Sequence, residues 1–159
     1  RHTAWWQDLL FTPKVRATEL QFRRTVEEVI EFLELQHYRD SMVAGLPYGV
    51  RKVVEVGRAL AMRPKLLLLD EPSSGLNVDE TEDMGFWIED IKHDLGITVI
   101  MVEHDMGLVS RVSDRVFALN QGEELALGTA AEVQAHPAVI EAYLGGVDDD
   151  APAAAGAAA

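Results

Sequence analysis

The spacing of apolar positions along the chain changes near residue 66. Before that point, apolar side chains recur every three or four positions over residues 22–33 and 50–61, as in helices with one buried face. After it, residues 66–69 and 97–102 form short apolar runs without that period. Such runs are typical of strands that are buried on both faces of a parallel sheet. The pattern therefore predicts two helices followed by an α/β region.

Capping and helix-breaking residues set the predicted bounds of these elements. A capping box of Thr18 and Gln21 predicts the start of the first long helix, which would end near His37. The second helix should stop before Pro64, because the residue preceding a proline disfavours helix. Later helices are predicted at residues 78–94, 106–112, 130–135 (opened by a Thr129–Glu132 capping box) and 137–144, with a strand at 115–119 and its antiparallel partner at 123–127.

The order of elements is unusual for a complete domain. Two helices precede a strand–helix–strand–helix–strand segment, which looks like a helical subdomain followed by half of a doubly wound α/β sheet. A three-stranded parallel half-sheet would leave an open edge, so we expect that sequence is missing. The absence of Met before Arg1 is typical of a fragment or a processed product. Residues 148–159 have low complexity and are predicted to be disordered.

Composition and charge narrow the classes of partner. Hydrophobic residues make up 48% of the chain and charged residues 26%, which is ordinary for a globular protein. Cysteine is absent, which excludes disulfides and thiolate metal sites. The net charge of −13 is uneven, with a balance of +3 over residues 1–65 and −16 over residues 66–159. Because the acidic part would repel a polyanion, we expect no nucleic-acid partner.

The first candidate for chemistry is the acidic pair Asp70-Glu71, which directly follows the apolar run at residues 66–69. The carboxyl ends of parallel strands form the edge at which α/β sheets bind ligands. The first carboxylate can hold Mg²⁺, and the second can orient and deprotonate a water for attack on a γ-phosphate. An acidic pair can also simply end a strand and face solvent. The neighbouring motifs therefore have to distinguish a functional pair from a solvent-exposed one.

Those companions occur in a recognisable order. Leu46-Pro47-Tyr48-Gly49-Val50 comes before the acidic pair, Ser74-Gly75-Leu76-Asn77 follows it, and His104 lies just after the next apolar run. Over residues 40–145 the chain resembles the ABC ATPase family. Residues 66–71 are similar to its Walker B strand, 46–50 to its signature sequence, 74–77 to its D-loop, and His104 to its switch histidine.

The resemblance implies a fold and a domain layout. The fold is an α/β P-loop NTPase of the ABC nucleotide-binding type, here incomplete. A helical subdomain with the signature would span residues 1–63. The C-terminal half of the RecA-like parallel sheet, with the C-terminal helices, would span residues 64–147, and a disordered tail would span 148–159.

The resemblance also implies an activity, with ATP and Mg²⁺ as the bound groups. Glu71 would be the general base, Asp70 the Mg²⁺ ligand and His104 the sensor of the γ-phosphate. Residues 46–50 would close on a nucleotide held by a second ATP-binding subunit, and Ser74, Gly75 and Asn77 would line the seam between the two subunits. The assembly would be a motor for transmembrane permease subunits, bound peripherally at the cytoplasmic face of the membrane.

The signature departs from the family's common Leu-Ser-Gly-Gly-Gln. Gly49 at a predicted helix start still allows close approach to the free N–H groups there, which can bind phosphate, although a plain loop-to-helix turn is the structural alternative. Pro47, Tyr48 and Val50 stand where the family has Ser, Gly and Gln. The Leu-Pro-Tyr-Gly form and residues 136–145 resemble the ATP-binding subunits of branched-chain amino-acid importers, although Val50 departs even from these.

The sequence contains no Gly-x-x-x-x-Gly-Lys-Ser/Thr, the loop that cradles the β- and γ-phosphates. We therefore expect a parent protein that hydrolyses ATP and a chain that alone does not. A truncated or degenerate non-enzymatic half-domain and a soluble ABC ATPase unlinked to transport stay open as alternatives. The solute is also open between branched-chain amino acids, amides and aromatic acids. Trp5 and Trp6 would pack in a short helix or contact a membrane partner.

Overall fold

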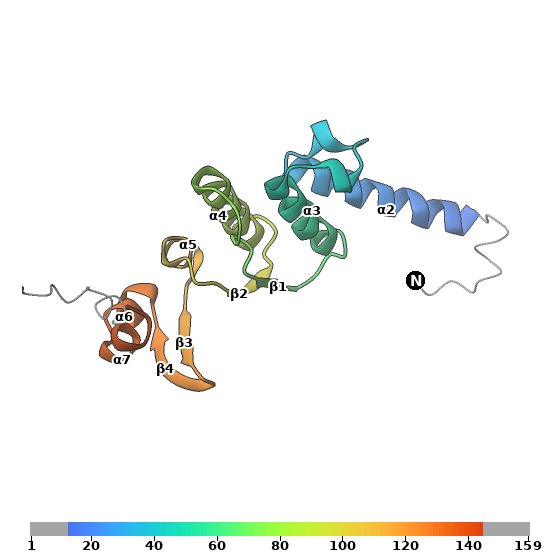
Figure 1. Cartoon of the computed structure of the whole chain (residues 1–159). Helices are drawn as coiled ribbons and strands as arrows, with labels where there is room; N and C mark the ends of the chain where they lie inside the picture. The colour runs from blue at the N-terminus through green and yellow to red at the C-terminus, as the bar shows by residue number, and fades with distance from the viewer. Residues whose placement is uncertain (1–12, 145–159) are drawn as a thin grey trace, which may run out of the picture. The chain divides into compact units, whose positions relative to one another are not determined.

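The computed structural model describes residues 13–144, which form two compact units that divide between Glu103 and His104 (Figure 1). The expectations for Trp5, Trp6 and the tail at 148–159 lie outside the described residues. The predicted domain boundary at residue 63 stays a prediction. Within residues 13–144, none of the helices combines the length and the apolar character that a membrane crossing requires.

The first unit is mixed helix and strand, in the order that the apolar pattern predicts. Its elements are α2 (Pro13–Phe32), the 3-10 turns η1 (Gln36–Tyr38) and η2 (Val43–Gly45), α3 (Tyr48–Leu60), β1 (Leu66–Asp70), α4 (Val78–His93) and β2 (Thr98–Val102).

The predicted bounds of the first long helix are wrong. Thr18 lies inside α2 rather than at its N-cap, because the segment from Pro13 is already helical and Pro is well suited to the first turn of a helix. The helix ends at Phe32 rather than near His37, and Glu34 adopts a left-handed backbone with φ 56°. Leu33, just after α2, packs against α3, where a Cβ on Gly57 would lie 3.0 Å from its Cδ1 atom.

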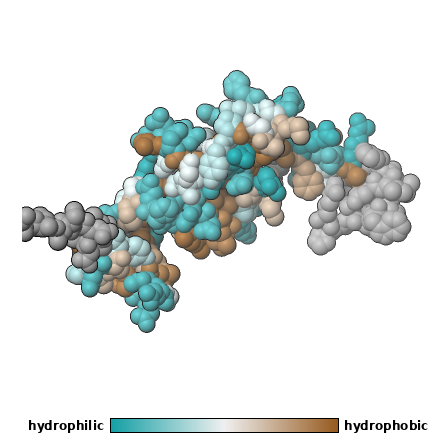
Figure 2. Space-filling model, viewed as in Figure 1, coloured by the Kyte–Doolittle hydropathy of each residue, from teal (hydrophilic) through white to brown (hydrophobic). Residues whose placement is uncertain are grey.

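The strand pair β1–β2 is parallel, with Leu66 opposite Thr98 and Asp70 opposite Val102. The prediction that these strands are buried on both faces is wrong. Leu67 is buried, but Leu68 is 68% exposed and Ile100 is 55% exposed. Among the described residues, α4 packs on β2. Figure 2 shows apolar surface where β1 and β2 lie in Figure 1.

The second unit is a hairpin packed against short helices. Its elements are α5 (Met106–Val112), β3 (Val116–Asn120), β4 (Glu123–Gly128), α6 (Ala130–Gln134), α7 (Pro137–Val139) and the π-type turn η3 (Ile140–Leu144). β3 pairs with β4 in antiparallel fashion, as predicted, with an irregular register between Ala118 and Leu119. The prediction that β3 would be the third strand of the parallel sheet is therefore wrong. The described strands form two separate two-stranded sheets.

Candidate functional site

The acidic pair lies at the carboxyl end of the parallel pair, as the sequence predicts. Asp70 is the last residue of β1 and is opposite Val102, the last residue of β2. The Glu71 N–H donates to the Val102 carbonyl at 2.9 Å, so the chain stays attached to β2 for one residue beyond β1. Both acidic residues are exposed. This edge can therefore present two carboxylates to a ligand.

Glu71 has an unusual backbone. Its φ is 44°, in the left-handed region that residues with a Cβ rarely adopt. Its carbonyl oxygen accepts two hydrogen bonds, from the Ser74 N–H and from the Lys52 ammonium, each at 3.2 Å. The turn that follows β1 is thus held both by its own backbone and by a side chain from α3.

A buried contact ties the same turn to the end of β2. The Ser73 N–H and hydroxyl both donate to the Glu103 carboxylate, at 2.8 and 2.6 Å. Ser73 is buried, and Glu103 comes directly after β2. Sequence reasoning missed this pair. The signal that could have found it is the position of Glu103 at the same sheet edge as Glu71, since parallel strands bring their carboxyl ends together.

The signature-like segment forms the start of α3. Pro47 is the N-cap and has no capping side chain, while Leu46 and Gly49 are buried and Val50 is half-buried. A Cβ on Gly49 would lie 2.3 Å from the Glu80 Oε1 atom, so any larger residue there would have to displace the Glu80 side chain. The predicted helix start at Gly49 is confirmed. Its role toward phosphate stays a prediction.

Tyr48 connects this helix start to the loop after β1. Its hydroxyl donates to the Ser74 carbonyl at 3.2 Å. Gly75 has a φ of 79°, and a Cβ there would lie 2.9 Å from the Tyr48 ring. Arg51 and Lys52 lie over the same ring, at 5.6 and 5.9 Å from its centroid. The structure therefore brings Tyr48, Ser74 and Gly75 together with Glu71.

Asn77 has a structural role in this loop. It is the N-cap of α4, where its side chain accepts from the Glu80 N–H at 2.9 Å while the Glu80 carboxylate accepts from the Asn77 N–H at 3.0 Å. This capping box fixes where the loop ends and α4 begins. Any role of Asn77 at a seam between subunits stays a prediction.

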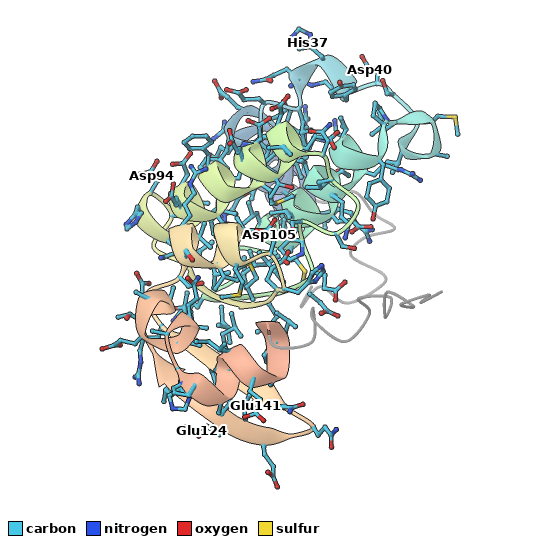
Figure 3. All side chains as sticks on the ribbon, turned by 60° about the vertical axis from the view of Figure 1, so that its left-hand side comes forward. His37, Asp40, Asp94, Asp105, Glu124 and Glu141 are labelled. Carbon is cyan, nitrogen blue, oxygen red and sulfur yellow. The ribbon has the colours of Figure 1, made fainter. Side chains whose placement is uncertain are left out.

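His104 is the first residue of the second unit and is exposed. It directly precedes Asp105, the N-cap of α5, whose carboxylate accepts from the Gly107 and Leu108 N–H groups at 2.9 and 3.0 Å (Figure 3). This cap places His104 just before a short helix. Its predicted role as a γ-phosphate sensor stays a prediction.

Within residues 13–144, no three His, Asp or Glu side chains are grouped so that they could bind one ion. Asp70 offers a single carboxylate at the sheet edge, which suits Mg²⁺ only if other ligands come from water and from a bound phosphate.

Most of the chain is similar to known families and sequences. A family model described as ABC transporter matches residues 3–74, and one described as branched-chain amino acid ATP-binding cassette transporter matches residues 123–149. The high-affinity branched-chain amino acid transport ATP-binding protein LivG of Salmonella typhimurium is 35% identical over 143 residues, which cover 90% of this chain and 56% of LivG. Over 90% of its length, the chain is therefore similar to an ABC transporter ATP-binding protein.

The chain is also similar to ATP-binding proteins that are named for different solutes. BraF of Pseudomonas aeruginosa, also named for branched-chain amino acid transport, is 35% identical over 91% of this chain and 56% of its own length. The sulfate/thiosulfate import protein CysA of Methylococcus capsulatus is 36% identical over 87% of this chain and 41% of its own length. This chain spans about half the length of the curated relatives it matches.

Solved structures confirm the fold class. An ATP-binding cassette of an ABC transporter in its ADP conformation matches with a TM-score of 0.73 and 30% identity, over 79% of this chain and 50% of that one. A nucleotide-free ATP-binding cassette matches with a TM-score of 0.73 and 27% identity, over 89% of this chain and 56% of that one. The predicted α/β fold of the ABC ATP-binding type is therefore confirmed.

Proposed function

We propose that this chain serves in the ATP-hydrolysing motor subunit of an ABC importer for branched-chain or related amino acids. The observation that supports it best is the acidic pair Asp70-Glu71 at the carboxyl edge of β1, joined by hydrogen bonds to the start of α3. The ABC ATP-binding relatives supply the reaction class, since such proteins hydrolyse ATP.

Glu71 is the general base in this proposal. Its backbone is fixed by bonds to β2 and α3, and its side chain is exposed at the ligand-binding edge, where it can accept a proton from a water. Asp70 contributes one carboxylate to a Mg²⁺ whose remaining ligands are water and phosphate oxygens. Proteins commonly bind Mg²⁺ with one or two carboxylates together with substrate phosphates.

The start of α3 faces a second nucleotide in this proposal. Residues 46–50 close on ATP that a second ATP-binding subunit holds, since a helix N-terminus carries free N–H groups and partial positive charge. Ser74, Gly75 and Asn77 line the seam between the subunits, and His104 contacts the γ-phosphate. Val50 weakens the polar character of this end, because the family's glutamine would supply an amide there.

The relatives support a proposal for the partners and the solute. We propose that the chain pairs with a second ATP-binding subunit and with transmembrane permease subunits at the cytoplasmic face of the membrane. Two observations favour branched-chain amino acids over sulfate as the solute. LivG and BraF are named for branched-chain amino acid transport, and the family model that matches residues 123–149 is described by the same solute.

The first test is the coding DNA upstream of Arg1. An in-frame Gly-x-x-x-x-Gly-Lys-Ser/Thr would supply the phosphate loop and support the motor. A start codon without such a loop would support the alternative, a non-enzymatic half-domain that offers only its α3 end to a partner.

The second test measures ATP hydrolysis by the form that contains a phosphate loop. Glu71→Gln should lower turnover by about 100-fold or more while ATP remains bound, because the general base is lost and the binding groups are not. Glu31→Gln, the same substitution at an exposed position of α2, is the matched control and should leave turnover unchanged. Near-normal hydrolysis by Glu71→Gln would show that the base assignment is wrong.

A further inference from the structure

The turn from Glu71 to Ser74 is the part of the site whose conformation most needs support. Glu71 has a φ of 44°, and such a backbone persists in a residue with a Cβ only where the surroundings impose it. The Val102 carbonyl, at the end of β2, accepts from the Glu71 N–H. The Glu103 carboxylate, on the next residue, accepts from the Ser73 N–H. These two contacts engage N–H groups of the turn. The carbonyl groups of Glu71 and Ser74 have other partners.

The carbonyl groups are held by two side chains from α3. Lys52 donates to the Glu71 carbonyl and Tyr48 donates to the Ser74 carbonyl, both at 3.2 Å. Tyr48 and Lys52 are four residues apart, which places them one above the other on the same helix face. The Lys52 ammonium also lies 5.9 Å from the Tyr48 ring centroid, so each side chain restricts the other.

We propose that Lys52, held in place by Tyr48, is a positioning residue for Glu71. Lys52 acts on the backbone of Glu71 through the carbonyl oxygen and thereby sets the direction in which the Glu71 side chain leaves the sheet edge. Its role in turnover rests on the proposed function of Glu71 as general base, whereas its hold on the turn does not depend on that function.

The neighbouring Arg51 provides a matched control. It lies over the same Tyr48 ring, 5.6 Å from the centroid, and carries the same charge. The structure shows Lys52 donating to the Glu71 carbonyl, and it is this bond that distinguishes the two cations. Lys52→Met and Arg51→Met therefore remove one positive charge each from the same place, and only the first removes the bond to the turn.

The first experiment measures amide hydrogen exchange in the full chain. Lys52→Met should speed exchange of the Ser74 amide, which donates to the Glu71 carbonyl, by about threefold to tenfold, given the strength of a charge-assisted bond at an exposed site. Lys52→Arg should restore the slow rate, and Arg51→Met should match the wild type. Equal rates in Lys52→Met and Arg51→Met would overturn the proposal.

The second experiment measures steady-state ATP hydrolysis by the form that contains a phosphate loop. Lys52→Met should lower kcat by about tenfold with KM for ATP unchanged, because a displaced base slows chemistry without weakening binding. Lys52→Arg should recover most of kcat. A faster exchange with unchanged kcat would overturn the positioning role. Normal turnover in Glu71→Gln would instead overturn the proposed function, and the exchange rates would still decide whether Lys52 holds the turn.

Discussion

The two described strand pairs differ in direction, because one is parallel and the other antiparallel. The candidate functional residues Asp70 and Glu71 lie at the end of the parallel pair. β1 and β2 are parallel, so their carboxyl ends meet at one edge. There Glu71 begins the turn after β1, and Glu103, the residue after β2, contacts that turn at Ser73. β3 and β4 are antiparallel, so the end of β3 turns directly into β4 through Gln121 and Gly122. A parallel pair brings distant segments to one edge, whereas a hairpin joins neighbours.

The same comparison applies to how each pair is supported. The parallel pair packs on α4, whose inner face includes the fully buried Ile91. The hairpin packs on α6 and α7, and the Tyr143 hydroxyl donates to the Leu119 carbonyl. Both pairs nevertheless expose apolar side chains, Leu68 in the first and Phe117 in the second. Helix packing on one face is thus common to both units, and the loop chemistry is specific to the parallel one.

The largest expected effect tests how far the parallel pair depends on α4. Ile91→Ala should lower the free energy of unfolding by about 2–5 kcal/mol, because the side chain is 0% exposed and its removal leaves a cavity. Ile100→Ala on β2 is the matched control, since that side chain is 55% exposed and should cost well under half as much. Chemical denaturation followed by circular dichroism measures both. Equal losses would mean that the open face of β2 contributes as much as the α4 core.

A second comparison uses two glycines with similar backbones. Gly75, in the loop after β1, has a φ of 79°, and Gly122, in the hairpin turn, has a φ of 87°. Alanine at either position should lower the free energy of unfolding by about 1–2 kcal/mol, because a Cβ disfavours the left-handed region. Gly75→Ala should cost more than Gly122→Ala, since its Cβ would lie 2.9 Å from the Tyr48 ring, while nothing lies within 4 Å of a Cβ at Gly122.

The extra cost at Gly75 can be isolated by the same unfolding measurement. Tyr48→Ala removes the ring, so in that background Gly75→Ala should cost no more than Gly122→Ala does in the wild type. If the difference persists without the ring, the contact with Tyr48 does not explain it.

The two units each contain a capping box, and these should have similar strength. Asn77→Ala at the start of α4 and Thr129→Ala at the start of α6 should each destabilise by about 1 kcal/mol, because each side chain satisfies an N–H in the first helical turn. Amide exchange in the first turn of each helix reports the local loss. A much larger effect at Asn77 would indicate that its cap also supports the loop that carries Glu71.

The smallest expected effect is that the stability contributed by Glu132, in the second unit, depends on pH. The Thr129 N–H and hydroxyl donate to the Glu132 carboxylate, and these bonds lower the pKa of Glu132 from its ordinary 4.5. A lowered folded-state pKa means that the contribution is complete above about pH 4.5 and is lost as pH falls through the folded value. The wild type should therefore exceed Glu132→Gln in thermal stability near pH 7, and the two should converge in acid. Glu123→Gln, an exposed change in the same unit, should show no such convergence.

Local signals in the sequence predicted several elements well. The helices predicted to begin at residues 78 and 106 do so as α4 and α5, with Asn77 and Asp105 as their N-caps. α6 begins at the predicted Thr129–Glu132 capping box. These predictions hold because a cap and the helix that it opens lie within a few residues of each other. The capping box predicted at Thr18 fails for the complementary reason, since the preceding segment from Pro13 already continues the helix.

The identity of the acidic pair and its place at the end of a strand were determined by the sequence alone, because four apolar residues followed by two carboxylates define both. Which strands pair was decided only in the tertiary structure, and the apolar run of β1 could not show that Leu68 would be exposed. The support of Glu71 by Lys52, 19 residues away, is likewise tertiary. Burial and long-range hydrogen bonds depend on which distant segments meet, and no local pattern of side chains encodes that meeting.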